Sequence, residues 1–97
     1  EIPIGAFVFM PARMELRTPD DKVITLTYKD AAILSLLYRH RNNVVSRDDL
    51  LHKIWGDNSL YHSRTLDVYI NRIRKYFSNS PNTIITLKGV GYRFICG

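Results

Sequence analysis

The chain has 97 residues, of which 45% are hydrophobic and 24% are charged, and its formal net charge is +5. A chain of this length and composition is expected to fold as one small domain with one core, which disfavours a multi-step enzyme. It contains no run of about 18 apolar residues and no leader-like start, so the expected location is cytoplasmic. Its single cysteine, Cys96, cannot form an internal disulfide.

The positive charge is concentrated toward the C-terminus. Basic and acidic side chains cancel over residues 1–59, whereas residues 60–97 contain a single acid, Asp67. A one-sided positive field attracts a polyanion, with nucleic acid as the first candidate and an anionic membrane as the second. The bases of the C-terminal segment are Arg64, Arg72, Arg74, Lys75, Lys88 and Arg93.

The first 26 residues are expected to form an antiparallel sheet. Residues that favour strands cluster near 4–10, 13–17 and 23–26, and the turn-forming segments "MPAR" and "TPDDK" separate them. We therefore predict three short strands ahead of the first helix.

The spacing of apolar residues then changes to that of helices. A first helix is predicted after a Thr27 cap, because Asp30 stands three residues later and Leu26 and Ala31 can close a hydrophobic staple. The "RNN" segment at 41–43 can supply the left-handed turn that ends this helix.

Two further helices follow. The second is predicted from about Arg47 to Trp55, between a Ser46 cap and Gly56. We expect a polar loop up to His62 and a third helix that Ser63 caps, over 64–77.

The third helix has two contrasting faces. At about 100° per residue, Ile70, Ile73 and Phe77 lie within about 40° of Leu66 and form a stripe that packs inward. The opposite face mixes basic, amide and small aliphatic side chains, as helices in the DNA major groove do. A merely solvated surface is the alternative, but such a surface would carry more acids and no exposed valine. The residues of this face are Arg64, Val68, Asn71 and Lys75, with Arg72 on its flank.

Residues 84–97 predict a β-hairpin about a Lys-Gly-Val-Gly turn. The glycines lack the strand-then-helix context of a nucleotide-binding loop, so we expect no cofactor. In a wing they would let Lys88 approach a phosphate or the minor groove. The sequence therefore predicts one α+β winged helix-turn-helix domain over 1–97, with an N-terminal antiparallel sheet (1–26), a three-helix core (27–83) and a wing hairpin (84–97).

Three segments, "VVSRDDLLHKIWG", "SRTLDVYINRIRKYF" and "TIITLKGVGYRF", closely resemble the C-terminal effector domain of OmpR/PhoB-type two-component response regulators. The resemblance covers essentially the whole chain. It implies a transcription factor domain that places its third helix in the major groove of double-stranded DNA and its wing at the minor groove. It also implies tandem half-sites, a preceding receiver domain with a boundary at residue 1, and a phosphorelay from an upstream sensor histidine kinase.

The resemblance also assigns roles to individual residues. The implied DNA contacts are Arg64, Thr65, Val68, Tyr69, Asn71, Arg72, Arg74 and Lys75 on the third helix, Thr86, Lys88 and Tyr92 on the wing, and Arg47 and Trp55 on the second helix. The implied contacts with RNA polymerase lie at Asp57, Asn58, Leu60 and Tyr61. Tyr69 and Asn71 stand where family members often carry histidine or a basic residue, so no base preference can be transferred.

Other functions fit the sequence less well. An enzyme needs an acid/base pair or a nucleophile with an orienting partner, whereas His40, His52 and His62 are scattered and show no metal-ligand spacing. Neither catalysis nor a metal site is expected. RNA binding would favour a sheet of stacking aromatic residues. A winged helix that binds proteins instead of DNA is the serious alternative, and such a module would not need the basic face.

Overall fold

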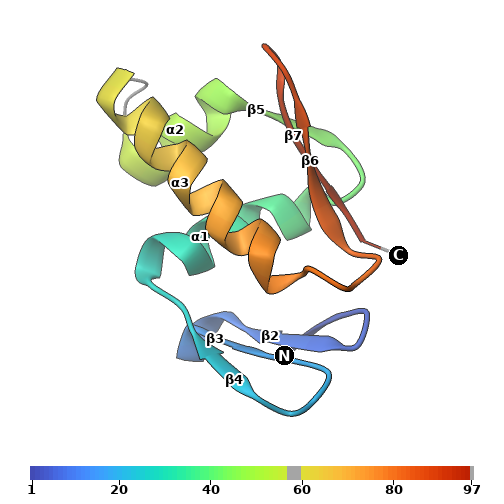
Figure 1. The fold of residues 1–97 in the computed structure, drawn as a ribbon. Coiled ribbons are helices and arrows are strands. Elements are labelled where there is room, and N and C mark those ends of the chain that lie inside the picture. The colour runs from blue at the N-terminus through green and yellow to red at the C-terminus, as the bar shows by residue number, and fades with distance from the viewer. Residues whose placement is uncertain (57–59, 97) are drawn as a thin grey trace.

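The structure, a computed structural model, describes residues 1–56 and 60–96. An N-terminal sheet lies below a group of three helices, and a β-hairpin rises beside the helices (Figure 1). This arrangement confirms the predicted winged helix-turn-helix.

The N-terminal sheet has four antiparallel strands in the order β1-β2-β3-β4. The prediction of three strands was wrong, because Gly5 has a φ of +58° and turns the chain within the expected strand 4–10. Ile4 therefore pairs with Phe7 across a tight hairpin. The strands are β1 (Ile2–Ile4), β2 (Phe7–Met10), β3 (Glu15–Arg17) and β4 (Val23–Thr25), with a short 3-10 helix, Pro11–Arg13, after β2.

The first helix, α1 (Tyr28–Arg39), begins as the sequence predicts. The Asp30 amide donates to Thr27 Oγ1 at 3.1 Å, and the Thr27 amide donates to Asp30 Oδ2 at 3.3 Å, so the capping box is complete. Asn42 has a φ of +66°, which confirms the left-handed turn after the helix.

The second helix also has the predicted bounds. In α2 (Arg47–Trp55), Ser46 Oγ accepts a hydrogen bond from the Asp49 amide at 3.0 Å, and Gly56 ends the helix in the left-handed region. Local capping chemistry therefore determined both helices.

The third helix, α3 (Leu60–Tyr76), begins before the predicted start. The expectation of a loop through His62 was wrong, and Ser63 is not its cap. Ser63 lies inside the helix, where its hydroxyl oxygen accepts hydrogen bonds from the Arg47 guanidinium of α2. Its polar side chain is satisfied by a neighbouring helix and marks no boundary.

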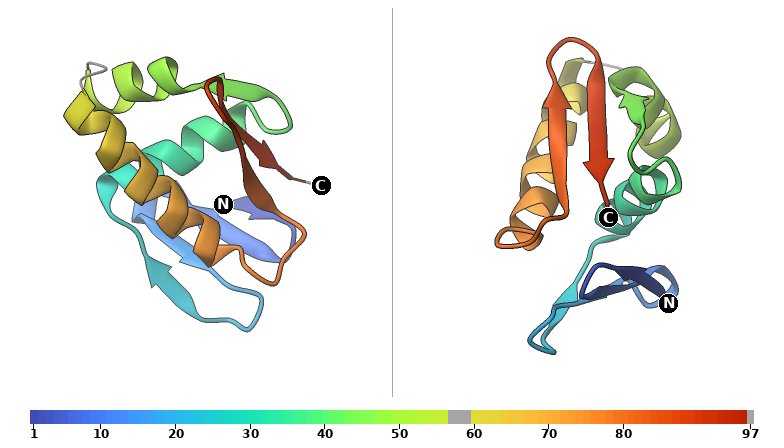
Figure 2. Two further views of the ribbon diagram at one scale, coloured as in Figure 1. Left: turned by 45° about the horizontal axis from the view of Figure 1, so that its top comes forward. Right: turned by 90° about the vertical axis from the view of Figure 1, so that its right-hand side faces the viewer.

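A second, three-stranded sheet carries the wing, with the order β5-β7-β6. Its strands are β5 (Val44–Ser46), β6 (Thr83–Leu87) and β7 (Gly91–Ile95). The sequence did not predict β5, which pairs with β7 just before α2 begins. A Cβ atom at Gly91 would lie 2.1 Å from the Val45 carbonyl oxygen, so only glycine fits here. Figure 2 shows the hairpin between α3 on one side and the β5–α2 segment on the other.

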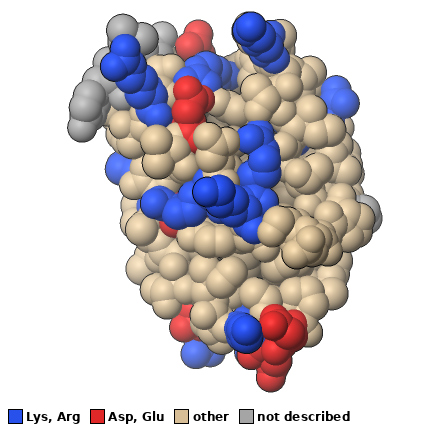
Figure 3. Space-filling view, viewed as in Figure 1, with Lys and Arg blue, Asp and Glu red and all other residues tan. Residues whose placement is uncertain are grey.

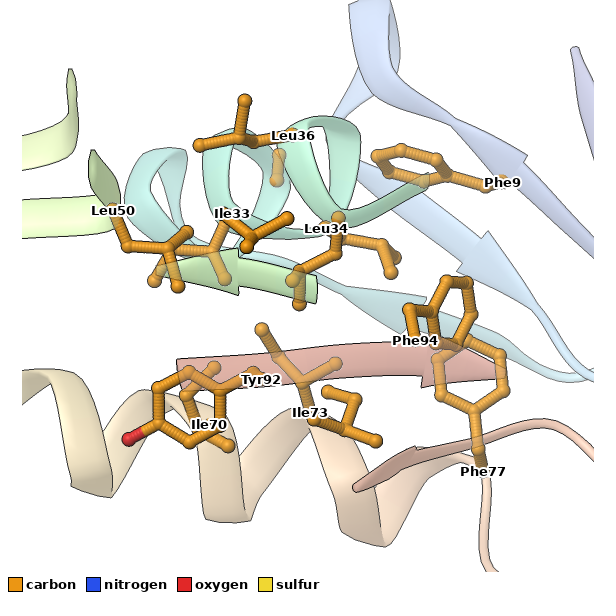
Figure 4. Close-up of a cluster of buried hydrophobic side chains, with 14 of the residues drawn as sticks. Phe9, Ile33, Leu34, Leu36, Leu50, Ile70, Ile73, Phe77, Tyr92 and Phe94 are labelled. Carbon is orange, nitrogen blue, oxygen red and sulfur yellow. The ribbon is translucent and has the colours of Figure 1, made fainter. Parts of the chain in front are cut away.

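The core joins all of these parts (Figure 4). The predicted apolar stripe is confirmed, since Leu66, Ile70 and Ile73 of α3 and Phe77 directly after it are almost completely buried. The Phe77 ring lies 4.8 Å from that of Phe7 in β2 and 5.5 Å from that of Phe94 in β7, measured between centroids. Because Phe77 touches both sheets, the packing of α3 fixes the wing and the N-terminal sheet together.

Candidate nucleic-acid interface

The outer face of α3 carries the mixed side chains that its sequence predicts. Arg64, Val68, Asn71 and Lys75 are all exposed, and Val68 is 60% exposed. Within residues 1–56 and 60–96, no hydrogen bond or ion pair is found for the side chains of Arg64, Lys75 and the wing residue Lys88. We call Arg64, Val68, Asn71 and Lys75 the α3 ridge. It presents cations, an amide and an apolar group to solvent.

Charge is distributed unevenly over the surface. In Figure 3, which has the same orientation as Figure 1, basic side chains lie across the upper and middle parts of this face, over α3 and the wing. Acidic side chains lie at its lower end, near the β3–β4 turn, and also among the basic side chains of the upper part. The basic area thus coincides with the ridge and the hairpin, where a polyanion would meet few acids.

A polar network ties α2, α3 and the wing together behind the ridge. Arg47 Nη1 donates to Asp67 Oδ1 at 2.7 Å and also contacts the Tyr92 hydroxyl, while Arg47 Nη2 donates to the Ser63 carbonyl oxygen at 2.7 Å. The Tyr92 hydroxyl donates to Asp67 Oδ1 at 2.8 Å. We call Arg47, Ser63, Asp67 and Tyr92 the α2–wing network. It leaves Arg47 with several intramolecular partners.

The network shifts the protonation equilibria of its members. The hydrogen bond from Arg47 lowers the pKa of Asp67, against the opposing effect of burial. Burial, followed by the hydrogen bond to Asp67, raises the pKa of Tyr92 to about 12. Asp67 is therefore a carboxylate and Tyr92 a neutral donor near neutral pH.

A second connection joins α3 to the wing through Arg74. Its Nε donates to the Ile84 carbonyl oxygen at 2.9 Å, and its Nη2 donates to Thr86 Oγ1 at 2.6 Å. Its Nη1 donates to Asn71 Oδ1 at 2.8 Å. Arg74 therefore bridges the ridge and strand β6.

A groove of about 510 Å³ separates α3 from the hairpin. Polar groups from both elements line it, with Asn71 on one side and Thr86 and Lys88 on the other. Gly89, with a φ of +77°, makes the turn at its outer end, which confirms the role predicted for this glycine. The groove gives an extended anionic ligand access to both elements.

Arg72 has a partner that the sequence analysis did not anticipate. Its Nη2 donates to Asp30 Oδ1 at 2.9 Å, and only 1% of the Asp30 side chain is exposed. Its guanidinium also lies 4.6 Å from the centroid of the Tyr69 ring. Asp30 raises the pKa of Arg72. Arg72 thereby ties α3 to the first turn of α1.

The predicted site residues form separate groups. Tyr69 and Trp55 lie beside the ridge in an aromatic cluster, where their rings meet edge to face at 5.8 Å and Lys29 lies over Trp55 at 5.2 Å. Thr65 is half-buried in α3. Among the predicted polymerase contacts, Leu60 and Tyr61 belong to α3, whereas Asp57 and Asn58 lie outside the described residues.

Sequence reasoning missed Ser63, Asp67 and Asp30 as organisers of this surface. The available signal was that Asp67 is the one acid among six bases in residues 60–97, because such an acid is expected to pair with a particular basic side chain. No such signal marked Asp30, since its role as a capping residue already accounted for it.

The described part of the chain shows neither a metal cluster nor a membrane-spanning helix. No group of three or more His, Cys, Asp or Glu residues that could hold a metal ion occurs within 1–56 and 60–96. No helix among these residues is long and apolar enough to cross a membrane.

Three helices, a hairpin beside the last helix and a basic exposed ridge define a winged-helix DNA-binding domain. The family model described as "Transcriptional regulatory protein, C terminal" matches residues 21–94. The chain belongs to this family, the OmpR/PhoB-type effector domains of response regulators. It is a non-enzymatic, sequence-specific DNA-binding domain for the regulation of transcription.

Individual proteins show the same relationship. The transcriptional regulatory protein RprY of Bacteroides fragilis is 36% identical over 93 residues, which are 95% of this chain and 39% of RprY. The chain thus spans about two fifths of that relative. The DNA-binding domain of Bacillus subtilis CssR has a TM-score of 0.79 at 27% identity, covering 92% of this chain and 99% of that one. The Klebsiella pneumoniae RstA DNA-binding domain, solved in complex with the RstA box, also has a TM-score of 0.79 at 27% identity, covering 97% and 95% of the two chains.

Proposed function

We propose that α3 enters the major groove of duplex DNA while the turn of the wing reaches the adjacent minor groove. The observation that carries this proposal is the α3 ridge, whose exposed cations, amide and valine lie beside a wing that holds Lys88 in solvent. A helix in the major groove needs donors for base edges and phosphates and an apolar group for thymine methyls.

The contacts of each residue favour a division of labour. Arg64, Lys75 and Lys88 have no partner within residues 1–56 and 60–96, so we assign them to phosphates. We assign Val68 to a thymine methyl group and Asn71 to a base edge. The remaining predicted contacts are held by other side chains or lie at the edge of the ridge, and we propose that they position it. These are Arg47, Trp55, Thr65, Tyr69, Arg72, Arg74, Thr86 and Tyr92.

This division changes the role of Arg72, which the family resemblance implies as a DNA contact. For Arg72 to read a base, its guanidinium would have to leave Asp30, a carboxylate that is almost completely buried. Its departure would leave the buried Asp30 carboxylate without its cation, which is costly. We therefore propose that Arg72 orients the helix.

The wider assembly is proposed by analogy with the family. The chain covers about two fifths of the length of relatives that include response regulators, such as the heme response regulator HssR of Staphylococcus epidermidis. We propose a receiver domain and a sensor kinase as partners, cytoplasmic action, and binding to tandem half-sites. We also propose that Asp57, Asn58, Leu60 and Tyr61 contact RNA polymerase.

The proposal is tested by selecting bound sequences from a randomised duplex library and measuring affinity at two salt concentrations. The expected result is a short enriched motif whose affinity falls steeply with salt, because several phosphates are neutralised. Val68→Ala should relax the preference for thymine at one position of that motif. Salt-insensitive binding without any enrichment would refute the proposal and favour a winged helix that binds proteins.

A further inference from the structure

The side-chain amide of Asn71 has a fixed orientation. Arg74 Nη1 lies 2.8 Å from Asn71 Oδ1. A guanidinium has only donors, so the amide atom that faces it must be the carbonyl oxygen. The amide NH₂ group is therefore the part of Asn71 that is left without a partner from Arg74.

Arg74 is itself held in place at the other end of this contact. Its Nε donates to the Ile84 carbonyl oxygen at 2.9 Å and its Nη2 donates to Thr86 Oγ1 at 2.6 Å, both on strand β6. All three guanidinium nitrogens therefore have acceptors within the protein. Because one of these acceptors is a backbone carbonyl in a paired strand, the guanidinium cannot move without breaking its link to the wing.

The position of Asn71 makes this orientation relevant to DNA. Asn71 is exposed on the ridge, one turn from Val68, and it lines the groove between α3 and the wing. A ligand that fills the groove or covers the ridge meets the Asn71 NH₂ group directly. Arg74 is less exposed and lies on the wing side of α3.

The fixed amide discriminates between bases. Asparagine reads adenine by offering its oxygen to N6–H₂ and its NH₂ to N7, side by side. Here one lone pair of the oxygen is engaged in a charge-assisted bond, which is stronger than a bond between neutral groups and turns the oxygen toward Arg74. The free donors match edges that present acceptors, namely guanine O6 and N7 or thymine O4.

We propose that Arg74 is a positioning residue that holds the Asn71 oxygen on its own side and presents the NH₂ group to DNA, so that the domain selects guanine or thymine over adenine at the base pair that Asn71 faces. This proposal rests on the proposed DNA-binding function. It names a determinant of specificity that touches no base.

The test compares sequence selections by the intact chain and four variants. Asn71→Ala identifies the base pair that Asn71 faces, because the base preference should disappear at that position and at no other. Asn71→Asp keeps an acceptor for Arg74 but removes both donors, and it should lower affinity for the preferred base on the order of tenfold. Arg74→Met frees the Asn71 oxygen and should shift the preference at this one position toward adenine. Ile85→Ala is the control, since it changes an exposed side chain on the same strand as Thr86 that belongs to no predicted contact, and it should leave the preference unchanged.

The possible results separate the two proposals. If the wild-type chain enriches a motif but selects adenine at the position that Asn71→Ala identifies, the donor assignment is overturned while DNA binding stands. The same holds if Asn71→Ala changes no position, or if a folded Arg74→Met variant keeps the wild-type preference. Circular dichroism shows whether Arg74→Met folds. If it does not, Asn71→Asp tests the donor assignment instead, because unchanged binding by that variant also overturns it. Absence of any enriched motif with the wild-type chain would overturn both proposals.

Discussion

The N-terminal sheet and the α3–wing region use charged side chains in opposite ways. In the sheet, the ion pairs join near neighbours, with Arg17 3.8 Å from Asp21 and Lys22 3.6 Å from Asp20. In the α3–wing region they join distant segments, as Arg47 does with Asp67. Short-range pairs neutralise a surface, whereas long-range pairs assemble a binding face and leave other cations free. The difference indicates that the α3–wing region is the side of the molecule that suits an anionic partner.

The largest effect is expected where the two regions meet. Phe77→Ala should lower the free energy of unfolding by about 3–5 kcal/mol, because it removes a buried ring that touches Phe7 and Phe94. Both regions should then unfold together at a lower denaturant concentration than in the unsubstituted chain, and circular dichroism measures this unfolding. Val23→Ala on an exposed site of the sheet is the control, with an expected change within about 0.5 kcal/mol. A loss of stability no larger than that of the control would mean that Phe77 does not hold the two regions together.

A smaller, pH-dependent effect is expected from the α2–wing network. The pKa of Asp67 is lowered in the folded state, so its ion pair stabilises the fold above the unfolded pKa, and this contribution is lost as the pH falls through the folded value. Its side chain is 53% exposed, and solvent screening limits the contribution to about 1 kcal/mol. Asp67→Asn should therefore destabilise the domain at neutral pH and flatten the fall in stability below about pH 4.

Denaturant titrations at several pH values measure this effect. Asp21→Asn, which breaks an exposed pair in the sheet, serves as the matched control and should change the neutral-pH stability by only a few tenths of a kcal/mol. An equal effect of the two variants would contradict the distinction between the regions.

The smallest effect concerns two exposed lysines near hairpin turns. Lys88→Ala should weaken DNA binding slightly on every sequence and make the slope of log affinity against log salt shallower by about 0.9, the value for one phosphate contact. Lys22→Ala, which removes the same charge from the sheet, should leave the slope unchanged. Fluorescence anisotropy over a salt series gives both slopes. Equal slopes for the two variants would mean that Lys88 of the wing does not contact DNA.

Sequence reasoning succeeded where the determining contacts are local. The capping box of Thr27 and Asp30 and the Gly56 end of α2 are contained within a few residues, so they are legible in the sequence. The buried and exposed faces of α3 follow from its periodicity, which extends over the whole helix. The ridge was therefore predicted residue by residue.

It failed where residues far apart in the chain decide the structure. Strand β5 exists because it pairs with β7, where Ser46 lies opposite Gly91, and its three residues are too few to show the alternation of a strand. Ser63 looked like a helix cap until Arg47, 16 residues earlier, supplied its hydrogen bonds. For the same reason the partners of Arg72 and Arg74 could not be predicted, although both arginines had been placed at the interface.

The close approach at Gly91 also has a mechanical consequence. Because Gly91 packs against the Val45 carbonyl and pairs with Ser46, β5 holds the hairpin up to the residue that follows its turn. Its free tip is limited to Lys88 and Gly89, which lie beyond the last paired residues of β6 and β7, because the Val90 carbonyl oxygen accepts a hydrogen bond from the Arg47 amide at 3.3 Å. Changes in the length or composition of that tip can therefore redirect its reach while the paired strands and the ridge keep their positions.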